Sequence, residues 1–348
     1  MTSTLITGGT GFIGSHIVAT LTDAQVDLRC LVRPGSTNAH LSLPSDQLLE
    51  GDVCDHDSLS RACEGCDCVI HNAALVGDWG HARDFHRVNV EGTLNLLKAC
   101  VECGVGQVIM TGSISSYGEE NFEGERDENS PFNSHYRYMF DSVFPCAMNY
   151  YRDSKAQATE QALAFAGEHD LNLTILEPVW VFGEREFNTG FYEYLREVSR
   201  GARFLPGSST NNFHVIYAGD LGRAYLLAWQ RRLPGINRII IGNRQVDRMQ
   251  DIWNQFCRAA ELEPPRRLPQ WLVYPVGFMM ELLWTLTRRP QAPTLTRGRV
   301  NMFYDSITYS TQLAESLLGF RSEYTLAEAV DKTVAWYRDN SYLPTKRS

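Results

Sequence analysis

The chain has 348 residues, of which 43% are hydrophobic and 21% are charged, and its formal net charge is −9 at pH 7. This length and composition are typical of a globular protein with a sizeable core, and they favour two lobes. The negative charge, without any block of Lys and Arg, argues against a nucleic-acid partner. The most apolar stretch, 268–286, is interrupted by Pro275 and Glu281, which argues against a transmembrane segment.

The N-terminus and the cysteines indicate a cytoplasmic protein. Met1-Thr2-Ser3 leads directly into an expected strand, so no signal peptide is predicted. Cys63, Cys66 and Cys68 lie close together, but no His or Cys follows at zinc spacing. We therefore expect the nine cysteines to form neither a disulfide framework nor a metal site.

A glycine-rich turn near the N-terminus predicts a dinucleotide site. Thr4–Thr7 is typical of a short buried strand, and apolar residues from Ile13 onward recur at helical spacing. The turn between them needs a backbone that a pyrophosphate can approach and a helix N-terminus that favours the anion. The expected cofactor contacts are Gly8, Gly11, Phe12, Ile13 and Gly14. An ordinary glycine turn is the alternative, but the strand before it and the helix after it favour the nucleotide.

The second predicted strand, Val26–Val32, ends in Arg33-Pro34 instead of an acidic residue. An acid at this point would bind a ribose 2′-hydroxyl and repel a 2′-phosphate, whereas a guanidinium can pair with that phosphate. The sequence therefore favours NADP(H) over NAD(H). The alternative is that Arg33 is only a solvated arginine at the end of a loop.

The third and fourth predicted strands end in further cofactor candidates. Leu48–Val53 carries Asp52, which could accept a hydrogen bond from the adenine amino group, and Val53 beside it. Asp52 could equally cap the next helix, a role open also to Asp55 or Asp57. Val69–Ala74 ends in Ala73 and Ala74, whose small side chains let a cofactor approach the backbone.

A helix is predicted over Val88–Cys100, and a buried Asn89 near its start would need polar partners. We expect Asn89 to hold backbone near the site, with local capping as the alternative. The fifth predicted strand, Gln107–Thr111, precedes hydroxyl residues that include Ser113 and Ser115. The polar, aromatic stretch 119–149 is long for a connection and is expected to form a lid or a pocket wall.

Tyr151 and Lys155 open the next predicted helix and share one of its faces, since they lie four residues apart. A free tyrosine has a pKa of about 10, so acid–base work near pH 7 requires a lower value. The ammonium of Lys155 would stabilise the phenolate and so supply part of that shift. Such a pair also occurs by chance in many helices, and it is the dinucleotide loop and the serine at a strand end that favour a catalytic role.

Together these segments resemble the extended short-chain dehydrogenase/reductases, the NAD-dependent epimerase/dehydratase superfamily. The segments are Thr7-Gly8-Gly9-Thr10-Gly11-Phe12-Ile13-Gly14, Asp52-Val53-Cys54-Asp55, Asn72-Ala73-Ala74, Gly112-Ser113 and Tyr151-x-x-x-Lys155. Others are similar to the 3β-hydroxysteroid dehydrogenase-like branch: Gly77-Asp78-Trp79-Gly80, Val88-Asn89-Val90-Glu91-Gly92-Thr93, Leu268-Pro269-x-Trp271, Pro293-Thr294-Leu295-Thr296 and Leu318-Gly319-Phe320. The resemblance implies an α/β fold, with a Rossmann-type doubly wound parallel sheet and a smaller, irregular α+β substrate lobe.

The resemblance also implies roles for single residues. Tyr151 would be the acid/base, Lys155 would hold the cofactor ribose and lower the tyrosine pKa, and Ser113 would orient the substrate oxygen. Further cofactor contacts would come from Asn89, Thr111, Pro178 and Val181, and substrate contacts from Val76, Trp79, Ser115, Phe182 and Tyr217. One departure stands out, because family members commonly have Arg-Pro where this chain has Glu177-Pro178.

The expected dinucleotide domain comprises 1–180 and about 213–236, and the substrate lobe about 181–212 and 237–348. In that lobe the apolar run Trp271–Trp284 is core, an apolar substrate wall or a membrane-surface contact. The leading hypothesis is an oxidoreductase that interconverts a secondary alcohol and a ketone on an apolar substrate and forms a homodimer. The alternatives are a nucleotide-sugar epimerase or dehydratase and a non-catalytic protein that senses the cofactor.

Overall fold

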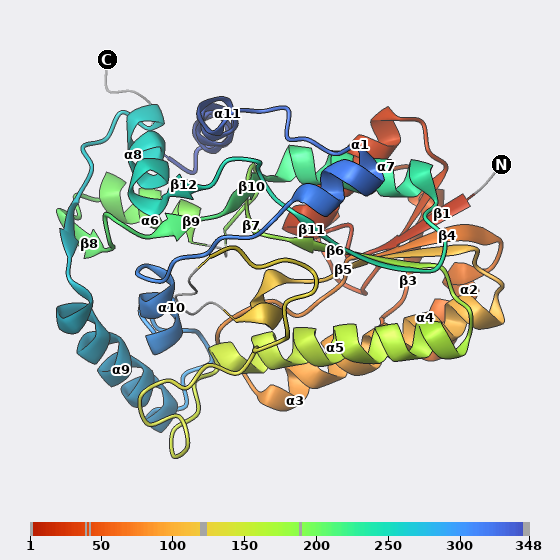
Figure 1. The fold of residues 1–348 in the computed structure, drawn as a ribbon, viewed down its shortest axis with the longest axis horizontal. Coiled ribbons are helices and arrows are strands. Elements are labelled where there is room, and N and C mark those ends of the chain that lie inside the picture. The colour runs from red at the N-terminus through yellow and green to blue at the C-terminus, as the bar shows by residue number, and fades with distance from the viewer. Residues whose placement is uncertain (1–2, 39, 42, 119–123, 188–189, 344–348) are drawn as a thin grey trace.

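A twisted parallel sheet forms the centre of the computed structural model, which describes residues 3–38, 40–41, 43–118, 124–187 and 190–343 (Figure 1). Met1, Thr2 and part of the expected lid, 119–123, lie outside these residues. Within the described chain the sheet has seven strands, all parallel. Their spatial order is β11 (Ile236–Ile241), β6 (Leu173–Pro178), β5 (Gln107–Thr111), β4 (Cys66–His71), β1 (Ser3–Thr7), β2 (Leu28–Val32) and β3 (Leu48–Glu50).

The central strands are apolar on both faces because helices cover both faces. Leu5, Ile6, Val69, Ile70 and Ile109 are fully buried. The predicted strands are confirmed, but β3 and β4 end three residues before the expected limits, and β2 begins two residues after its expected start. The residues after each strand, Arg33, Asp52 and Ala73 among them, are thereby left at the edge of the sheet where ligands of such folds bind.

Two layers of helices enclose the sheet. In Figure 1, α1 (Phe12–Asp23) and α7 (Ala218–Arg231) lie above it, and α2 (His56–Cys63), α4 (Gly92–Glu102) and α5 (Met148–Glu168) lie below or beside it. The predicted helix over 88–100 is in fact two segments, a π-helical turn η2 (His86–Glu91) and α4. The helix that carries Tyr151 and Lys155 begins three residues before Tyr151, so both residues lie inside regular helix.

A smaller lobe of short strands and helices stands at the carboxyl ends of the sheet strands, at the left of Figure 1. Its strand pairs are β7 (Trp180–Phe182) with β10 (Val215–Tyr217), β9 (Asn212–Phe213) with β12 (Asp247–Arg248), and β8 (Phe204–Pro206) with β13 (Arg266–Leu268). Its longer helices are α6 (Phe191–Ser199), α8 (Met249–Ala259), α9 (Gln270–Leu286) and α11 (Leu326–Asp339). Short helical segments complete the described chain: η1 (Ser45–Gln47), α3 (Ala82–Phe85), η3 (Ile114–Tyr117), α10 (Arg297–Met302) and η4 (Ala314–Leu318).

The expected division placed residues from 237 onward in the substrate lobe, but β11 lies in the main sheet. It pairs with β6 along its whole length, from Ile236 opposite Leu173 to Ile241 opposite Pro178. Three successive isoleucines, 239–241, are fully buried there, so they complete the core of the larger lobe. Residues 236–241 therefore belong to the larger lobe.

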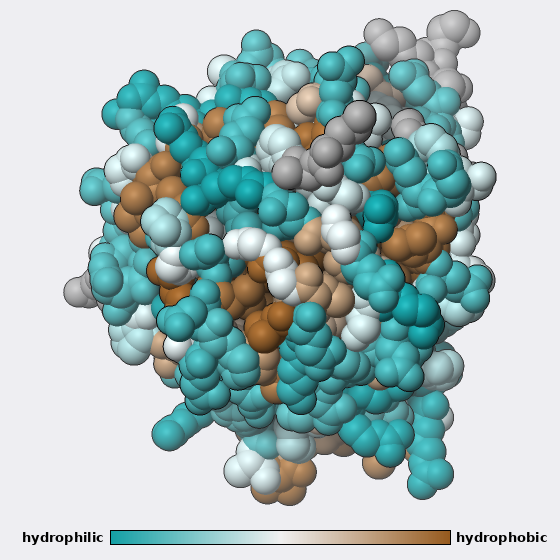
Figure 2. Space-filling model, turned by 90° about the vertical axis from the view of Figure 1, so that its right-hand side faces the viewer, coloured by the Kyte–Doolittle hydropathy of each residue, from teal (hydrophilic) through white to brown (hydrophobic). Residues whose placement is uncertain are grey.

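The molecular surface is uneven in character. The face seen from the right of Figure 1 is mainly hydrophilic, with apolar residues showing between polar ones (Figure 2). No helix in the described ranges combines the length and the hydropathy that a membrane crossing needs.

Candidate active site

The glycine-rich turn is closed so tightly that side chains would not fit. Gly8 has a φ of +71°, and a Cβ there would lie 2.6 Å from the Ala73 nitrogen. A Cβ on Gly14 would lie 2.0 Å from the Gly8 carbonyl oxygen. The turn from β1 into α1 therefore requires glycine at both positions, as the sequence predicted for a loop that a ligand approaches closely.

The first turn of α1 offers free donors to an anion. Gly11 is its N-cap and supplies no side-chain hydrogen bond, and no acidic residue lies in the first turn. The first N–H groups of a helix lack partners within the helix, and its dipole favours negative charge at this end. This N-terminus and the cradle of Gly8 and Gly14 fit the pyrophosphate of a dinucleotide.

At the expected adenosine end, Arg33 directly follows β2 and its side chain is exposed. Asp55, not Asp52, caps α2 by accepting a hydrogen bond from the Asp57 nitrogen. Oδ1 of Asp52 accepts from the Cys54 nitrogen at 2.9 Å, which shapes the turn after β3. Val53 is buried and contributes to the core.

Polar side chains link the ends of β1, β4 and β5. Asn72 donates to the Gly8 carbonyl at 3.3 Å and accepts from Thr111 Oγ1 at 3.0 Å, and the Tyr225 hydroxyl lies 2.6 Å from Thr111 Oγ1. Thr7 Oγ1 accepts from the Ala73 nitrogen and lies 2.8 Å from His71 Nδ1. Sequence reasoning missed Tyr225 and His71, because nothing in their local spacing marks them. They hold the strand ends in register beneath the candidate site.

Asn89 confirms the expectation of a buried asparagine that holds backbone. Its amide accepts from the Leu75 nitrogen at 2.7 Å and donates to the Leu75 carbonyl at 3.0 Å. It also donates to Ser154 Oγ at 2.9 Å. Because Ser154 lies on α5 beside Lys155, Asn89 fixes both the chain after Ala74 and the helix of the candidate acid/base.

The three candidate catalytic residues come from two places in the chain: the turn after β5, which holds Ser113, and α5, which holds Tyr151 and Lys155. Ser113 ends the turn after β5 and caps η3, and its Oγ lies 2.7 Å from that of Ser115. Tyr151 and Lys155 are one turn apart on α5. Lys155 Nζ donates to the Thr111 carbonyl at 2.7 Å, which connects α5 directly to the end of β5.

Burial lowers the pKa values of the two basic residues near the end of β5, Lys155 and His71. It lowers the pKa of Lys155 to about 8, against a smaller opposing effect of the Glu177 charge. Burial and the nearby Lys155 charge lower the pKa of His71 to about 3, so this imidazole is neutral. An amine with a pKa near neutrality is easily influenced by a ligand or a phenolate beside it.

Glu177, the departure from the family pattern, has its own cation. Its carboxylate is fully buried and accepts from the Tyr117 hydroxyl at 2.6 Å, and Arg238 Nε donates to it at 3.3 Å. The Arg238 guanidinium also lies 4.5 Å from the centre of the Phe132 ring and donates to the Tyr117 hydroxyl. Burial raises the pKa of Glu177, and Arg238 and the Tyr117 hydrogen bond oppose that rise. The pair lies next to the end of β5, since the Leu176 carbonyl accepts from the Gly112 nitrogen.

The predicted substrate residues divide into two groups. Val76 is 59% exposed and Trp79 is half-buried in the loop after β4. That loop is tied to the smaller lobe, because Asp78 pairs with Arg299 and the Trp79 indole donates to the Arg289 carbonyl at 3.0 Å.

Phe182 and Tyr217, by contrast, lie in the core of the smaller lobe. Phe182 is fully buried against the rings of Phe191 and Phe256, and the Tyr217 hydroxyl donates to Glu184. Their side chains are used in packing and in hydrogen bonding within this lobe. Val181 and Pro178 are likewise buried, and Ser115 is buried against Ser113.

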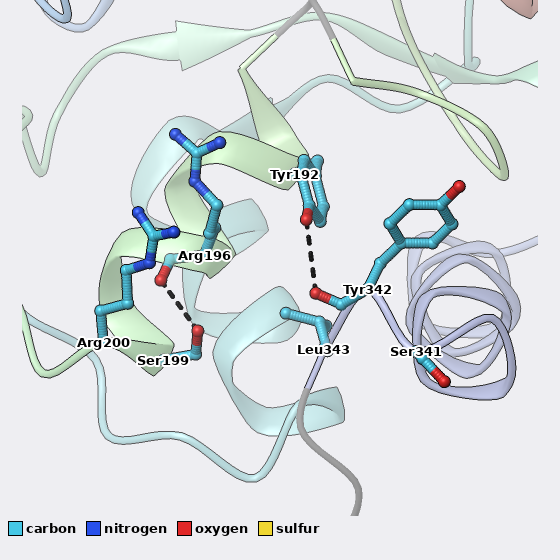
Figure 3. Close-up of a pocket in the computed structure, with 7 residues that line it drawn as sticks. All are labelled: Tyr192, Arg196, Ser199, Arg200, Ser341, Tyr342 and Leu343. Atoms are coloured by element: carbon cyan, nitrogen blue, oxygen red, sulfur yellow. Dashed lines mark hydrogen bonds between the residues drawn. The ribbon is translucent and has the colours of Figure 1, made fainter.

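A separate cavity of about 500 Å³ lies between α6 and the C-terminal end of the described chain (Figure 3). Its lining residues are Tyr192, Arg196, Ser199, Arg200, Ser341, Tyr342 and Leu343. None of the predicted site residues lines it, so it is distinct from the candidate active site.

The Glu177–Arg238 pair predicts a stability effect. Arg238→Met leaves a buried carboxylate without its cation and should lower the free energy of unfolding by about 3 kcal/mol. The double variant Glu177→Gln/Arg238→Met removes the charge as well and should recover at least half of that loss. Urea unfolding of both variants measures the effect, and a cost below about 1 kcal/mol for Arg238→Met would contradict it, since exposed pairs contribute that little.

Lys155 predicts a pH dependence of stability. Its folded pKa of about 8 is below the ordinary value of 10.5, so between these values the unfolded chain binds more protons and stability rises with pH. Relative to Lys155→Met, the wild type should therefore gain roughly 3 kcal/mol between pH 7 and pH 10.5. The control, Lys98→Met, removes an exposed lysine of α4. If both variants give the same curve, the buried position of Lys155 is not the cause.

Comparison with known proteins places this geometry among nicotinamide-dependent enzymes. A putative dihydroflavonol 4-reductase of Synechocystis is 27% identical, covering 98% of this chain and 96% of the relative. A 2-alkyl-3-oxoalkanoate reductase of Stenotrophomonas maltophilia is 25% identical over 95% and 98% of the two chains. The mouse 3β-hydroxysteroid dehydrogenase type 7 is 28% identical over 95% and 94%.

Solved structures agree on the fold. The protein gox2253 superimposes with a TM-score of 0.80 at 26% identity, covering 99% of this chain and all of that one. The UDP-glucose 4-epimerase of Thermotoga maritima, solved with UDP-glucose, has a TM-score of 0.76 at 19% identity over 97% and 99%. The family model of the NAD dependent epimerase/dehydratase family matches residues 4–242. The chain belongs to this family, the extended short-chain dehydrogenase/reductases.

Proposed function

We propose that this protein is an NADP(H)-dependent oxidoreductase that interconverts a secondary alcohol and a ketone on an apolar substrate. The observation that carries the proposal is the placement of Tyr151 and Lys155 on one face of α5, with Lys155 bonded to the end of β5 two residues before Ser113. The phenol of Tyr151 can transfer a proton, the ammonium of Lys155 can stabilise the phenolate, and the hydroxyl of Ser113 can orient the substrate oxygen. The glycine turn beside them supplies the place for a cofactor.

Each residue then has a defined task. The nicotinamide would supply or accept the hydride. In reduction, the Tyr151 hydroxyl gives its proton to the carbonyl oxygen, and Ser113 holds that oxygen by a hydrogen bond. Lys155 binds the cofactor ribose and stabilises the Tyr151 phenolate that remains. Gly8, Gly11 and Gly14 let the pyrophosphate rest on the backbone, and Arg33 pairs with the 2′-phosphate.

The relatives support a reductase over the other chemistries of the family. Three relatives that align along nearly their whole length are named as reductases or a dehydrogenase of ketone or alcohol groups. The epimerase structures are under 25% identical and speak for the fold alone. A nucleotide-sugar epimerase using the same Ser113, Tyr151 and Lys155 is the second candidate, and a cytoplasmic homodimer is part of the proposal for either.

The acid/base role of Tyr151 predicts a specific loss. Tyr151→Phe keeps the ring but has no proton to transfer, so turnover should fall about 100-fold or more while cofactor affinity changes little. The matched control is Tyr150→Phe, which changes the neighbouring half-buried tyrosine of the same helix. Steady-state rates and cofactor titration measure both effects. Normal turnover by Tyr151→Phe would show that another group transfers the proton.

The cofactor preference rests on Arg33. Arg33→Asp replaces a phosphate partner by a like charge, so it should weaken NADPH binding selectively and spare or improve NADH binding. Arg61→Asp reverses an exposed arginine of α2 and serves as the control. The test is to measure the dissociation constants of NADPH and NADH for each variant. An equal change for the two nucleotides would rule out the 2′-phosphate role.

The substrate class predicts a trend across compounds. If the loop of Val76 and Trp79 contacts the substrate, each buried methylene adds about 0.8 kcal/mol, so kcat/KM should rise with alkyl or ring size. A nucleotide-sugar site depends instead on charged partners for the diphosphate. Apolar β-hydroxy or β-keto compounds and fused-ring alcohols should therefore be converted, and UDP- and GDP-sugars should not. Epimerisation of a nucleotide sugar without net cofactor use would favour the second candidate.

A further inference from the structure

Exposed apolar side chains gather on one region of the smaller lobe. Six belong to α9 and three to the loop before α5, and we call this surface the α9 face. Its members are Met139, Phe140, Val143, Trp271, Leu272, Val276, Met279, Leu283 and Leu286. Most of the large hydrophobic side chains that are exposed among the described residues lie here.

The α9 face is an outward face of a helix that is anchored on its other side. Leu272, Val276, Met279, Leu283 and Leu286 follow one another at intervals of four and three residues, so they line one side of α9. On the other side Val273, Gly277 and Glu281 are buried, and α9 packs there against α10. Val143 is 85% exposed and Trp271 is 75% exposed, which is unusual for residues of this size.

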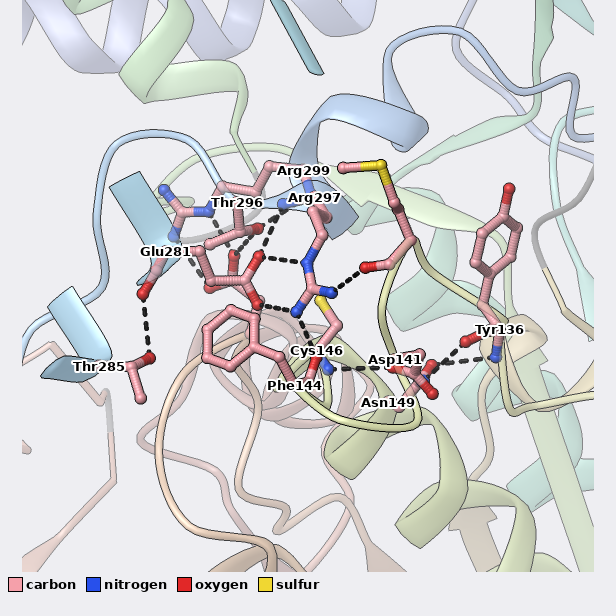
Figure 4. A network of polar contacts seen from close by, with 12 residues as sticks. Tyr136, Asp141, Phe144, Cys146, Asn149, Glu281, Thr285, Thr296, Arg297 and Arg299 are labelled. Carbon is pink, nitrogen blue, oxygen red and sulfur yellow. Dashed lines mark hydrogen bonds and ion pairs between the residues drawn. The ribbon is translucent and has the colours of Figure 1, made fainter. Parts of the chain in front are cut away.

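A buried ion pair holds the loop and the helix together as one surface (Figure 4). The Arg297 guanidinium donates to both Glu281 carboxylate oxygens at 2.9 Å. The same guanidinium donates to the carbonyls of Met139 and Phe144 at 2.6 and 2.8 Å. The loop tip is therefore fixed beside α9 and not free to fold inward over its own apolar residues.

Ring packing completes the connection. The rings of Phe140 and Phe144 lie 5.6 and 6.0 Å from that of Phe278 on α9, measured between centroids. The Tyr274 hydroxyl accepts from the Met139 nitrogen at 3.3 Å. These contacts leave Phe144 and Phe278 half-buried and Phe140, 60% exposed, on the outside.

The charge around the α9 face differs from that of the whole chain. Residues 264–304 contain six arginines and one acidic residue, Glu281, in a chain of net charge −9. Glu281 forms an ion pair with Arg297, and Arg299 forms one with Asp78. Arg288 and Arg289, at the end of α9, are exposed and form none of the ion pairs found between described residues. Arg289 instead lies 4.5 Å from the Trp284 ring centre.

This charge distribution decides between two occupants of the α9 face. A second copy related by a two-fold axis would bring α9 against itself, because such a contact uses the same patch on both subunits. In such a contact α9 offers no free carboxylate to the exposed Arg288 and Arg289 of the other copy, because its one carboxylate, Glu281, is buried with Arg297. An anionic lipid surface instead offers apolar chains to the helix and negative headgroups to the arginines. Trp271 lies at the start of α9, and Arg288 and Arg289 follow its end. Both residue types are suited to the boundary between the lipid chains and the headgroups.

We propose that the α9 face lies on the surface of a bilayer that contains anionic lipid, with α9 parallel to the membrane plane. The proposal is independent of the reaction. It has a consequence for the site, because the Trp79 indole bonds to the Arg289 carbonyl and so ties the loop after β4 to the end of α9. A compound dissolved in the bilayer would reach the protein beside that loop.

Vesicle co-sedimentation of the full chain tests the proposal. The protein should sediment with vesicles that contain one-third phosphatidylglycerol, and about tenfold less with pure phosphatidylcholine or at high salt. Met279→Glu/Leu283→Glu and Arg288→Glu/Arg289→Glu should each reduce binding at least tenfold. Ile236→Glu adds one negative charge at an exposed apolar residue of β11 and should bind like the wild type, whereas the single variant Leu283→Glu, which adds the same charge on the α9 face, should bind less. Thermal melting shows that each variant is folded.

Three results would overturn the proposal. One is the absence of binding to phosphatidylglycerol vesicles by the folded wild type. Another is undiminished binding by the Met279→Glu/Leu283→Glu variant. The third is a dimer in sedimentation velocity that dissociates on Leu283→Glu, because it would assign the α9 face to a second copy.

Discussion

The closeness of the glycine turn to the end of β4 is the constraint on which the candidate site depends. The backbone of Gly8 meets that of Ala73 at a distance that excludes a side chain, and Asn72 bridges the two strand ends. From there the hydrogen bonds run through Thr111 to β5, and from the Thr111 carbonyl to Lys155 on α5. The positions of the glycine turn and of α5 are thus set by one continuous set of contacts across three parallel strands.

The burial of Lys155 lowers the stability of its charged form and also changes its chemistry. Its ammonium is buried with one carbonyl partner among those described, and burial lowers its pKa to about 8. A charge held in such a place is destabilising for the fold, but in the proposed mechanism it would act on the Tyr151 phenol more strongly than a solvated lysine would. This is the kind of strain that folds retain at functional sites and not elsewhere.

The sequence alone predicted those parts of the molecule that have a local signal. Strands of continuous apolar residues, the glycine spacing and the i, i+4 pair on α5 each follow from short-range geometry. Asn89 was also foreseen, because a buried amide must find partners. The Glu177–Arg238 pair was not, since 61 positions separate its members and no spacing rule connects two strands that become neighbours only in the sheet. The burial of Phe182 and Tyr217 could not be predicted for a related reason: an aromatic residue near a strand end gives the same sequence signal whether its ring faces a pocket or the core.

The path of the chain between the two lobes has a consequence for how the molecule holds together. The chain leaves the sheet after β6, builds part of the smaller lobe, returns with α7 and β11, and leaves again. A fragment ending near residue 180 would keep the whole nucleotide loop, yet α1 would lose α7, and β6 would become an edge strand with its hydrogen-bonding groups open. The larger lobe is therefore not a detachable N-terminal module, because α7 and β11, which complete it, come from the later part of the chain.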